Sequence, residues 1–149
     1  MYKHILVPTD GSALSLKAAR AAAELAARLG AKVSALYVIP PFIPPATSEM
    51  WVSVRDLYSP REYDKTMQKE AAAFTAKVER VARAKKVACA HVAVTAADPW
   101  KAIIETARTR KCDLIVMSSH GRRGLAGLLL GSETQKVLTH TRIPVLVCR

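Results

Sequence analysis

His4–Ser12 reads HILVPTDGS, and this stretch decides the fold class. Its apolar run HILVP is ended at once by the turn residues TDGS, a pattern that predicts a short buried strand. The next segment, Ser12–Leu29, is rich in Ala, Leu, Lys, Arg and Glu with apolar residues at helical spacing, and Gly30 stands where a helix C-cap is expected. Lys32–Ile39 (KVSALYVI) is strand-like again. The start of the chain therefore predicts a strand–helix–strand unit.

The same alternation continues to the last residues. Pro40–Tyr58 is rich in proline and has no sustained period, so we expect a loop there. The elements expected after it are a helix from Ser59 to about Lys86, a strand at Val87–Thr95, a helix from Asp98 to about Lys111, a strand at Leu114–Ser118, a helix at Ser132–His140 and a strand at Pro144–Cys148. Apolar strands separated by amphipathic helices indicate an α/β fold: a single open five-stranded parallel sheet, Rossmann-like, with helices on both faces. We expect residues 1–149 to form one domain.

Two of these helices have recognisable starts. Ser59, Pro60 and Glu62 match a capping box with proline at the first helical position. Asp98 followed by Pro99 predicts a helix with Asp98 as its N-cap and Pro99 at its first position. Trp100, which comes next, is expected to pack against the sheet rather than to bind a ligand.

Composition excludes several classes of protein. Half of the 149 residues are hydrophobic, which excludes disorder for the bulk of the chain, and no apolar run is long enough for a membrane span. The first residues lead directly into folded-looking sequence rather than a signal peptide. Three scattered cysteines, Cys89, Cys112 and Cys148, indicate buried thiols in a reducing compartment, so we expect a cytoplasmic protein without a metal site.

The chain carries a net charge of +11. Such a charge is typical of proteins that bind nucleic acid, an anionic membrane surface or a phosphorylated small molecule. Aromatic residues make up only 5% of the chain, which is low for a protein that stacks bases, and the basic residues alternate with apolar ones along the helices. A solvated helix surface explains most of the charge better than a nucleic-acid patch does.

One loop combines glycines with positive charge. In an open parallel sheet, ligands bind beyond the carboxyl ends of the strands, where the strand order reverses. Asp10 follows the first strand, and SSHGRRGLAGLLLGSETQ (Ser118–Gln135) follows the fourth, with His120, Arg122 and Arg123 in it. Its glycines and the helix start at Ser132 suit an anion pocket. The alternative stays open, since Ser132 and Gln135 also form a plain capping box and loop glycines serve turns.

Other familiar motifs are absent from the sequence. It contains no GxxxxGK[ST] phosphate loop, no GxGxxG after the first strand and no GxSxG nucleophile motif. No residue can be named as a general base or an arginine finger for phosphoryl transfer. If the chain binds a nucleotide, its hydrolysis is therefore expected to be slow.

Three stretches carry a resemblance to a known family: ILVPTDGS at the start, VSALYVI as the second strand, and DLIVMSSHGRRGLAGLLLGSETQKVLTHTRIPVLVCR at the end. With these, nearly the whole chain resembles the universal stress protein family. Its nucleotide-binding members carry Gly-x-x-Gly, nine residues, then Gly-Ser or Gly-Thr. Gly121 matches the second glycine, and Gly131 with Ser132 follows after nine residues, whereas Ser118 replaces the first glycine. The Cβ of Ser118 stands where the backbone of a glycine would approach a ligand.

The resemblance implies an ATP site, with Mg²⁺ accompanying the phosphates. Asp10 would hold the ribose or the adenine edge, although it could also simply cap the first helix. The other implied binding residues are Pro8 and Val38 beside the adenine, Gly121, Gly131, Ser132 and Thr134 around the phosphates, and Met117 and Ser118 near them.

The resemblance also implies a homodimer formed through Pro144–Cys148, which fits an apolar edge strand that needs cover. The implied function is that of a nucleotide-responsive stress or signalling module. Two alternatives remain: a stress protein of this fold that acts through protein contacts without ATP, and, with less support, a binder of nucleic acid or anionic surfaces.

Overall fold

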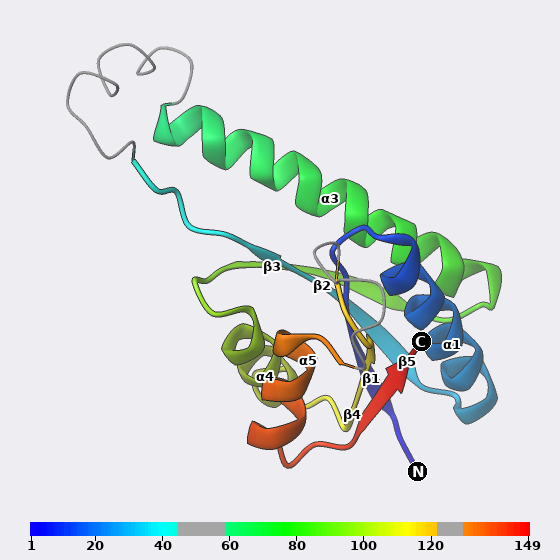
Figure 1. Cartoon of the computed structure of the whole chain (residues 1–149). Coiled ribbons are helices and arrows are strands. Elements are labelled where there is room, and N and C mark those ends of the chain that lie inside the picture. The colour runs from blue at the N-terminus through cyan, green and yellow to red at the C-terminus, as the bar shows by residue number, and fades with distance from the viewer. Residues whose placement is uncertain (45–58, 122–129) are drawn as a thin grey trace.

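The computed structural model describes residues 1–44, 59–121 and 130–149 (Figure 1). Within them it forms five strands and four helices. In chain order these are β1 (His4–Pro8), α1 (Ala13–Leu29), β2 (Lys32–Ile39), α3 (Pro60–Ala84), β3 (Cys89–Thr95), α4 (Pro99–Thr109), β4 (Leu114–Ser118), α5 (Ser132–His140) and β5 (Val145–Cys148).

The strands form one parallel sheet in the order β3-β2-β1-β4-β5. Ile5 of β1 pairs with Val33 of β2 on one side and with Leu114 of β4 on the other. The chain thus moves outward from β1 to β3 and then crosses to the other half of the sheet. The expected open five-stranded parallel sheet is confirmed, and its strand order reverses between β1 and β4, where a ligand site is expected.

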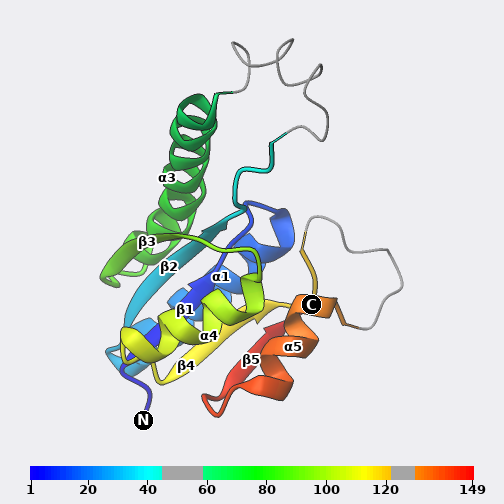
Figure 2. The same cartoon turned by 90° about the vertical axis from the view of Figure 1, so that its left-hand side faces the viewer.

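Helices cover both faces of the sheet, as predicted. Helices α1 and α3 lie on one face, and α4 and α5 lie on the other (Figures 1 and 2). Helix α1 buries a stripe of alanines, Ala18, Ala19, Ala22, Ala23 and Ala26, whose small side chains let the helix approach the sheet closely. The second face has its own core, in which Leu6, Ile115 and Val137 are fully buried.

Burial along each strand follows its place in the sheet. All five residues of β4 are buried, and in β1 only Pro8 is partly exposed. In β3 and β5, which form the two edges, partly buried residues are interspersed with exposed ones. The continuous apolar run LIVMS suits a central strand because both faces of such a strand lie under helices.

Two helix boundaries were predicted from local signals and are confirmed. The hydroxyl of Ser59 accepts the backbone N–H of Glu62 at 3.1 Å, with Pro60 as the first residue of α3. Gly30 ends α1 in the left-handed conformation, with φ of 65°, and its N–H donates to Ala26. Both signals act within one helical turn, which makes them visible in the sequence.

Other boundaries differ from the prediction. Helix α3 ends at Ala84 and α4 at Thr109, each about two residues early, and β3 begins at Cys89 rather than Val87. Two lysines, Lys86 and Lys111, adopt positive φ values of 58° and 54° after these helices. This left-handed conformation after a helix is usually taken by glycine and is unusual for lysine. Because lysine stands at both positions, no glycine marked these helix ends in the sequence.

The predicted start of α4, with Asp98 as N-cap and Pro99 as first helical residue, is confirmed, but the expected capping bond of Asp98 is absent. Its carboxylate instead pairs with Lys101 at 2.6 Å. The first turn of α4 therefore obtains its acceptor from elsewhere in the fold.

Part of the Pro40–Tyr58 segment lies outside the described residues. The residues up to Pro44 have no regular structure, in agreement with the loop expected there. They are held to α3 by Tyr63, whose hydroxyl donates to the Pro40 carbonyl at 2.7 Å and whose ring lies 5.3 Å from that of Phe42.

The three cysteines were expected to be buried, but only Cys112 is fully buried, while Cys89 and Cys148 are partly buried. All three cysteines are free, and burial raises the pKa of Cys112 to about 11 and that of Cys89 and Cys148 in the same direction. Within this part of the chain, no group of three or more His, Cys, Asp or Glu could hold a metal ion. The described helices include none with the length and apolar character needed to cross a membrane.

Candidate functional site

Asp10 lies at the carboxyl end of β1, at the point where the strand order reverses. Its Oδ1 accepts the backbone N–H of Ser12 at 3.0 Å. The N-cap of α1 is Ser12, whose hydroxyl accepts the N–H of Ser15 at 3.1 Å. Asp10 therefore orders the turn before the helix, and the alternative in which Asp10 is the helix cap is wrong. Asp10 is only partly buried.

Gly121, beyond the end of β4, lies against this carboxylate. A Cβ built on Gly121 would come within 2.7 Å of Asp10 Oδ2. Real Cβ atoms do not approach an oxygen this closely, so any side chain at Gly121 would displace the carboxylate. The structure thus brings together two predicted site residues that are more than a hundred positions apart in the sequence.

Gly131 is the N-cap of α5, whereas the capping box in the sequence would have made Ser132 the N-cap. Its N–H donates to the Ser119 carbonyl at 2.7 Å, and its carbonyl accepts from Gln135. A Cβ on Gly131 would lie 3.0 Å from His120 Cα, so glycine permits the close approach of α5 to the end of β4. The capping box with Ser132 as cap is wrong. Ser132 is exposed in the first turn, where backbone N–H groups have no intrahelical acceptor.

Thr134 and Ser118 form a contact beneath this turn. The Thr134 side chain is 2% exposed, and its hydroxyl donates to the Ser118 carbonyl at 3.0 Å. Ser118 ends β4 with no positive φ, so replacing the motif's first glycine by serine requires no unusual backbone conformation. Both residues therefore shape the floor of the site. The Thr134 hydroxyl donates its proton to Ser118 and does not have it available for a ligand.

The remaining predicted site residues lie on the same part of the sheet. Pro8 is the last residue of β1 and pairs with Leu36 of β2. Val38, two residues further along β2, is partly buried and packs with the same core as Met117, which is 5% exposed. Strands β1, β2 and β4 thus bring Pro8, Val38 and Met117 to the edge where Asp10 and Gly121 meet.

His120 is the described basic residue of the glycine-bearing loop. Its Nδ1 lies 3.1 Å from the Ser119 hydroxyl, and its side chain is partly exposed. Arg122, Arg123, Gly124 and Gly127, which the sequence analysis also placed in this loop, lie outside the described residues.

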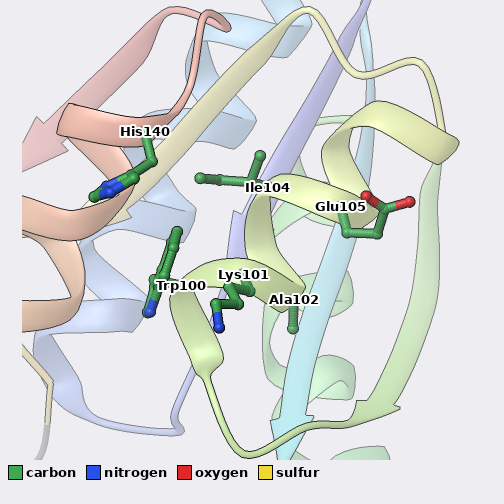
Figure 3. A pocket seen from close by; sticks show the side chains of 6 residues that line it. All are labelled: Trp100, Lys101, Ala102, Ile104, Glu105 and His140. Atoms are coloured by element: carbon green, nitrogen blue, oxygen red, sulfur yellow. The ribbon is translucent and has the colours of Figure 1, made fainter.

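A shallow hollow between α4 and α5 was not predicted (Figure 3). It has a volume of about 560 Å³ and is lined by Trp100, Lys101, Ala102, Ile104, Glu105 and His140. The Trp100 and His140 rings lie 4.6 Å apart, and Lys101 Nζ lies 5.3 Å from the indole centre. Trp100 also packs against the core of this face, as expected. Its side chain thus serves the packing of α4 on α5, which no local pattern could show.

A second hollow lies between α1 and α3, on the opposite face. It has a volume of about 510 Å³, with Leu16 and Val81 among its apolar residues and Lys77 and Arg80 among its basic ones. Close to it, Phe74 covers Gly11, where a Cβ would come within 2.5 Å of the ring. Gly11 has a φ of 79°, so the TDGS turn needs glycine for both its conformation and its packing.

Comparison with known proteins identifies the family. The model of the universal stress protein family matches residues 1–149. A universal stress protein of Methanocaldococcus jannaschii, MJ0531, is 34% identical over 151 residues, which span 100% of this chain and 83% of the relative. The chain belongs to the universal stress protein family, and the resemblance noted in the sequence is confirmed.

Solved structures agree in fold. Protein MJ0577, also from Methanocaldococcus jannaschii, superposes with a TM-score of 0.78 at 27% identity, covering 99% of this chain and 96% of that one. A universal stress protein solved in complex with cAMP superposes with a TM-score of 0.70 at 26% identity, covering 98% and 95% of the two chains. The family therefore includes a similar protein that binds an adenine nucleotide.

Proposed function

We propose that this protein binds ATP, or a closely related adenine nucleotide, at the carboxyl ends of β1 and β4. The observation that carries the proposal is the meeting of Asp10, Gly121 and the start of α5 at the point where the strand order reverses. The cAMP complex of a similar family member supports the same ligand class.

Each group has a role that its chemistry suits. The Asp10 carboxylate accepts hydrogen bonds from ribose hydroxyls, while backbone at Pro8 and Val38 flanks the adenine. The exposed Ser132 hydroxyl and the first-turn N–H groups of α5 bind phosphate oxygens, where the helix dipole favours negative charge. Mg²⁺ accompanies the phosphates.

The other motif residues act by shaping the site. The Gly131 N–H and the Thr134 hydroxyl already donate to Ser119 and Ser118. We assign them to fixing the position of α5 relative to β4, together with Met117 and Ser118 in the floor. Gly121 leaves room for the Asp10 carboxylate.

The protein acts as a nucleotide-responsive stress or signalling module of the cytoplasm, where its free thiols stay reduced. Hydrolysis is slow at most, because no general base has been identified for it. The working unit is a homodimer through β5, an edge strand on which Leu146 is 42% exposed.

Purified protein should release a bound adenine nucleotide or bind added ATP with Mg²⁺ in a saturable way. Absence of both, in a correctly folded sample, would favour the alternative of a family member that works through protein contacts alone. DNA binding that collapses with added salt would favour the nucleic-acid alternative instead.

A further inference from the structure

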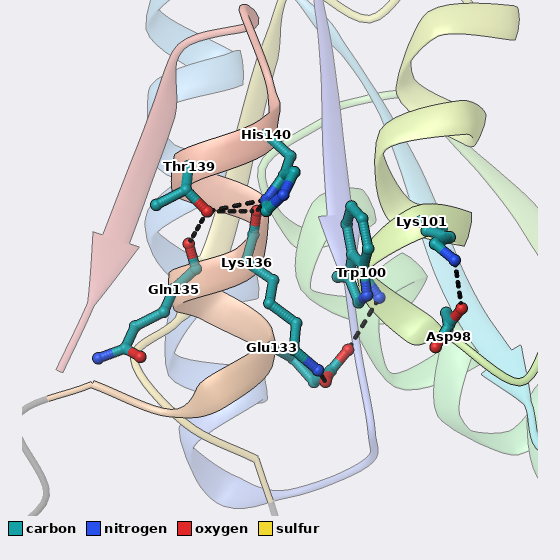
Figure 4. A network of polar contacts seen from close by, with 8 residues as sticks. All are labelled: Asp98, Trp100, Lys101, Glu133, Gln135, Lys136, Thr139 and His140. Carbon is teal, nitrogen blue, oxygen red and sulfur yellow. Dashed lines mark hydrogen bonds and ion pairs between the residues drawn. The ribbon is translucent and has the colours of Figure 1, made fainter.

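Helix α4 obtains its N-terminal cap from another helix. The backbone N–H of Trp100, the second residue of α4, donates to Glu133 Oε2 of α5 at 2.9 Å (Figure 4). Asp98, at the usual capping position, makes no such bond and pairs with Lys101. An N–H in the first turn of a helix has no acceptor within the helix. The Glu133 carboxylate therefore accepts an N–H that the neighbouring residues in the sequence do not bind.

Glu133 occupies a decisive place in α5. It follows Ser132 in the first turn, the turn whose N–H groups face the proposed phosphate site. A carboxylate beside bound phosphate would repel it unless the charge is held elsewhere. Here the side chain reaches across to α4, and its second oxygen lies 3.1 Å from Lys136 Nζ. The positive N-terminus of α4 and the Lys136 ammonium together compensate the charge.

The same bond connects two parts of the molecule. At one end is the start of α5, which Thr134 and Gly131 also tie to the end of β4. At the other end is Trp100, whose ring lies against His140 in the α4–α5 hollow. A shift of the first turn of α5 must therefore either move the Trp100 backbone or break this bond.

We propose that Glu133 is a positioning residue for the nucleotide site. It fixes the first turn of α5 through its bond to the Trp100 N–H and transmits nucleotide binding to the indole of Trp100. This inference rests on the proposed function, because the ligand it positions is the adenine nucleotide.

Four proteins test the proposal, all in a Trp51→Phe background that leaves Trp100 as the single tryptophan. They are the parent, Glu133→Ala, Glu133→Gln and the control Asp98→Ala. Glu133→Gln keeps an oxygen acceptor for the Trp100 N–H. Asp98→Ala removes a carboxylate from the same helix start without breaking a bond to backbone. Circular dichroism confirms that each variant is folded before ATP with Mg²⁺ is titrated.

Glu133→Ala should bind ATP about five- to tenfold more weakly, the size of a typical coupling between sites, and should lose the ATP-induced change in Trp100 emission. Glu133→Gln and Asp98→Ala should stay within about twofold of the parent and keep that change. Equal affinity and emission response in folded Glu133→Ala, or failure of Glu133→Gln to restore them, would overturn the inference and leave the proposed function intact. A parent that binds no ATP would instead refute the proposed function, and the inference with it.

Discussion

Asp10 Oδ2 occupies the space that a side chain at Gly121 would need, because a Cβ there would come within 2.7 Å of it. The contact joins the loop after β1 to the loop after β4, the two strands between which the sheet reverses its order. Glycine at this position therefore has a specific task. It lets the Asp10 carboxylate stand at the edge of the sheet, where we propose that it meets the ribose.

Gly121→Ala should weaken ATP binding about tenfold, comparable to the loss of a hydrogen bond to a charged group. The new methyl group pushes the Asp10 carboxylate out of position, and a flexible carboxylate can move at little cost to the fold. Calorimetric titration with ATP and Mg²⁺ measures the affinity, and urea unfolding measures the stability.

A double-mutant cycle shows whether the effect passes through Asp10. In an Asp10→Ala background, which has no carboxylate to displace, Gly121→Ala should have almost no further effect on affinity. If the two substitutions add in full, Gly121 acts independently of Asp10 and the assigned role is wrong.

Thr134→Val should lower the free energy of unfolding by about 1 kcal/mol, because it removes the buried hydroxyl that donates to the Ser118 carbonyl. Thr139→Val is a matched control in the same helix, since the Thr139 side chain is exposed and its hydroxyl bonds only within α5, to the carbonyls of Gln135 and Lys136 and to His140 Nδ1. Urea unfolding of both variants provides the comparison. Equal effects would mean that the contact between α5 and β4 contributes little.

Stability should fall as the pH is lowered below about 6.5 because of His4. Burial, followed by the charge of Lys32, lowers the pKa of His4 from its usual value of 6.5, and Nε2 lies 2.8 Å from the buried Ser34 hydroxyl. The folded state therefore favours neutral His4. This contribution is complete above pH 6.5 and is lost as the pH falls through the lowered folded pKa. The slope cannot exceed about 1.4 kcal/mol per pH unit, the limit for one proton.

His4→Gln isolates this effect, because glutamine keeps polar atoms near Ser34 but does not titrate. Unfolding curves in urea at a series of pH values should show a shallower decline for the variant. Asp113 titrates at lower pH than His4. Burial acts to raise the pKa of its carboxyl, but the hydrogen bonds that the carboxylate accepts from the N–H groups of Lys3 and His4 outweigh burial and lower this pKa. Parallel pH profiles for parent and variant would rule out His4 as the source.

Leu146→Glu should convert the proposed dimer into a monomer. Leu146 lies on the edge strand β5 and is 42% exposed, so a carboxylate there would be buried against the partner strand. Light scattering after gel filtration measures the mass. Ile43→Glu, at an 81% exposed residue outside the sheet, is the control. A parent that is monomeric, or a Leu146→Glu variant that remains dimeric, would contradict assembly through β5.

Local signals made most of the fold predictable. The run HILVP, the cap at Ser59 and the glycine at Gly30 each act within a few residues, so the sequence displays the whole interaction. The ends of α3 and α4 were missed because Lys86 and Lys111 take the left-handed conformation without glycine. The acceptor of the Trp100 N–H in the first turn of α4 was missed because this acceptor, Glu133, lies 33 residues beyond Trp100 and reaches it only in the folded chain.

The fold brings several of the predicted site residues together, but their hydrogen bonds could not be predicted from the sequence. The glycine spacing and the residues after the first strand selected Asp10, Gly121 and Gly131, and the fold gathers them at one edge. No sequence pattern shows that Ser119 already accepts the Gly131 N–H or that Thr134 donates to Ser118. Such bonds depend on how α5 packs against the end of β4, and they shift the proposed phosphate contacts toward Ser132 and its neighbouring N–H groups.

Titration of the folded protein with ATP and Mg²⁺, beside Asp10→Ala, tests the central claim most directly. The protein should bind ATP saturably, and Asp10→Ala should bind it about tenfold or more weakly while unfolding at a similar urea concentration. No saturable binding up to millimolar ATP, or unchanged affinity in Asp10→Ala, would contradict the nucleotide site proposed at the carboxyl ends of β1 and β4.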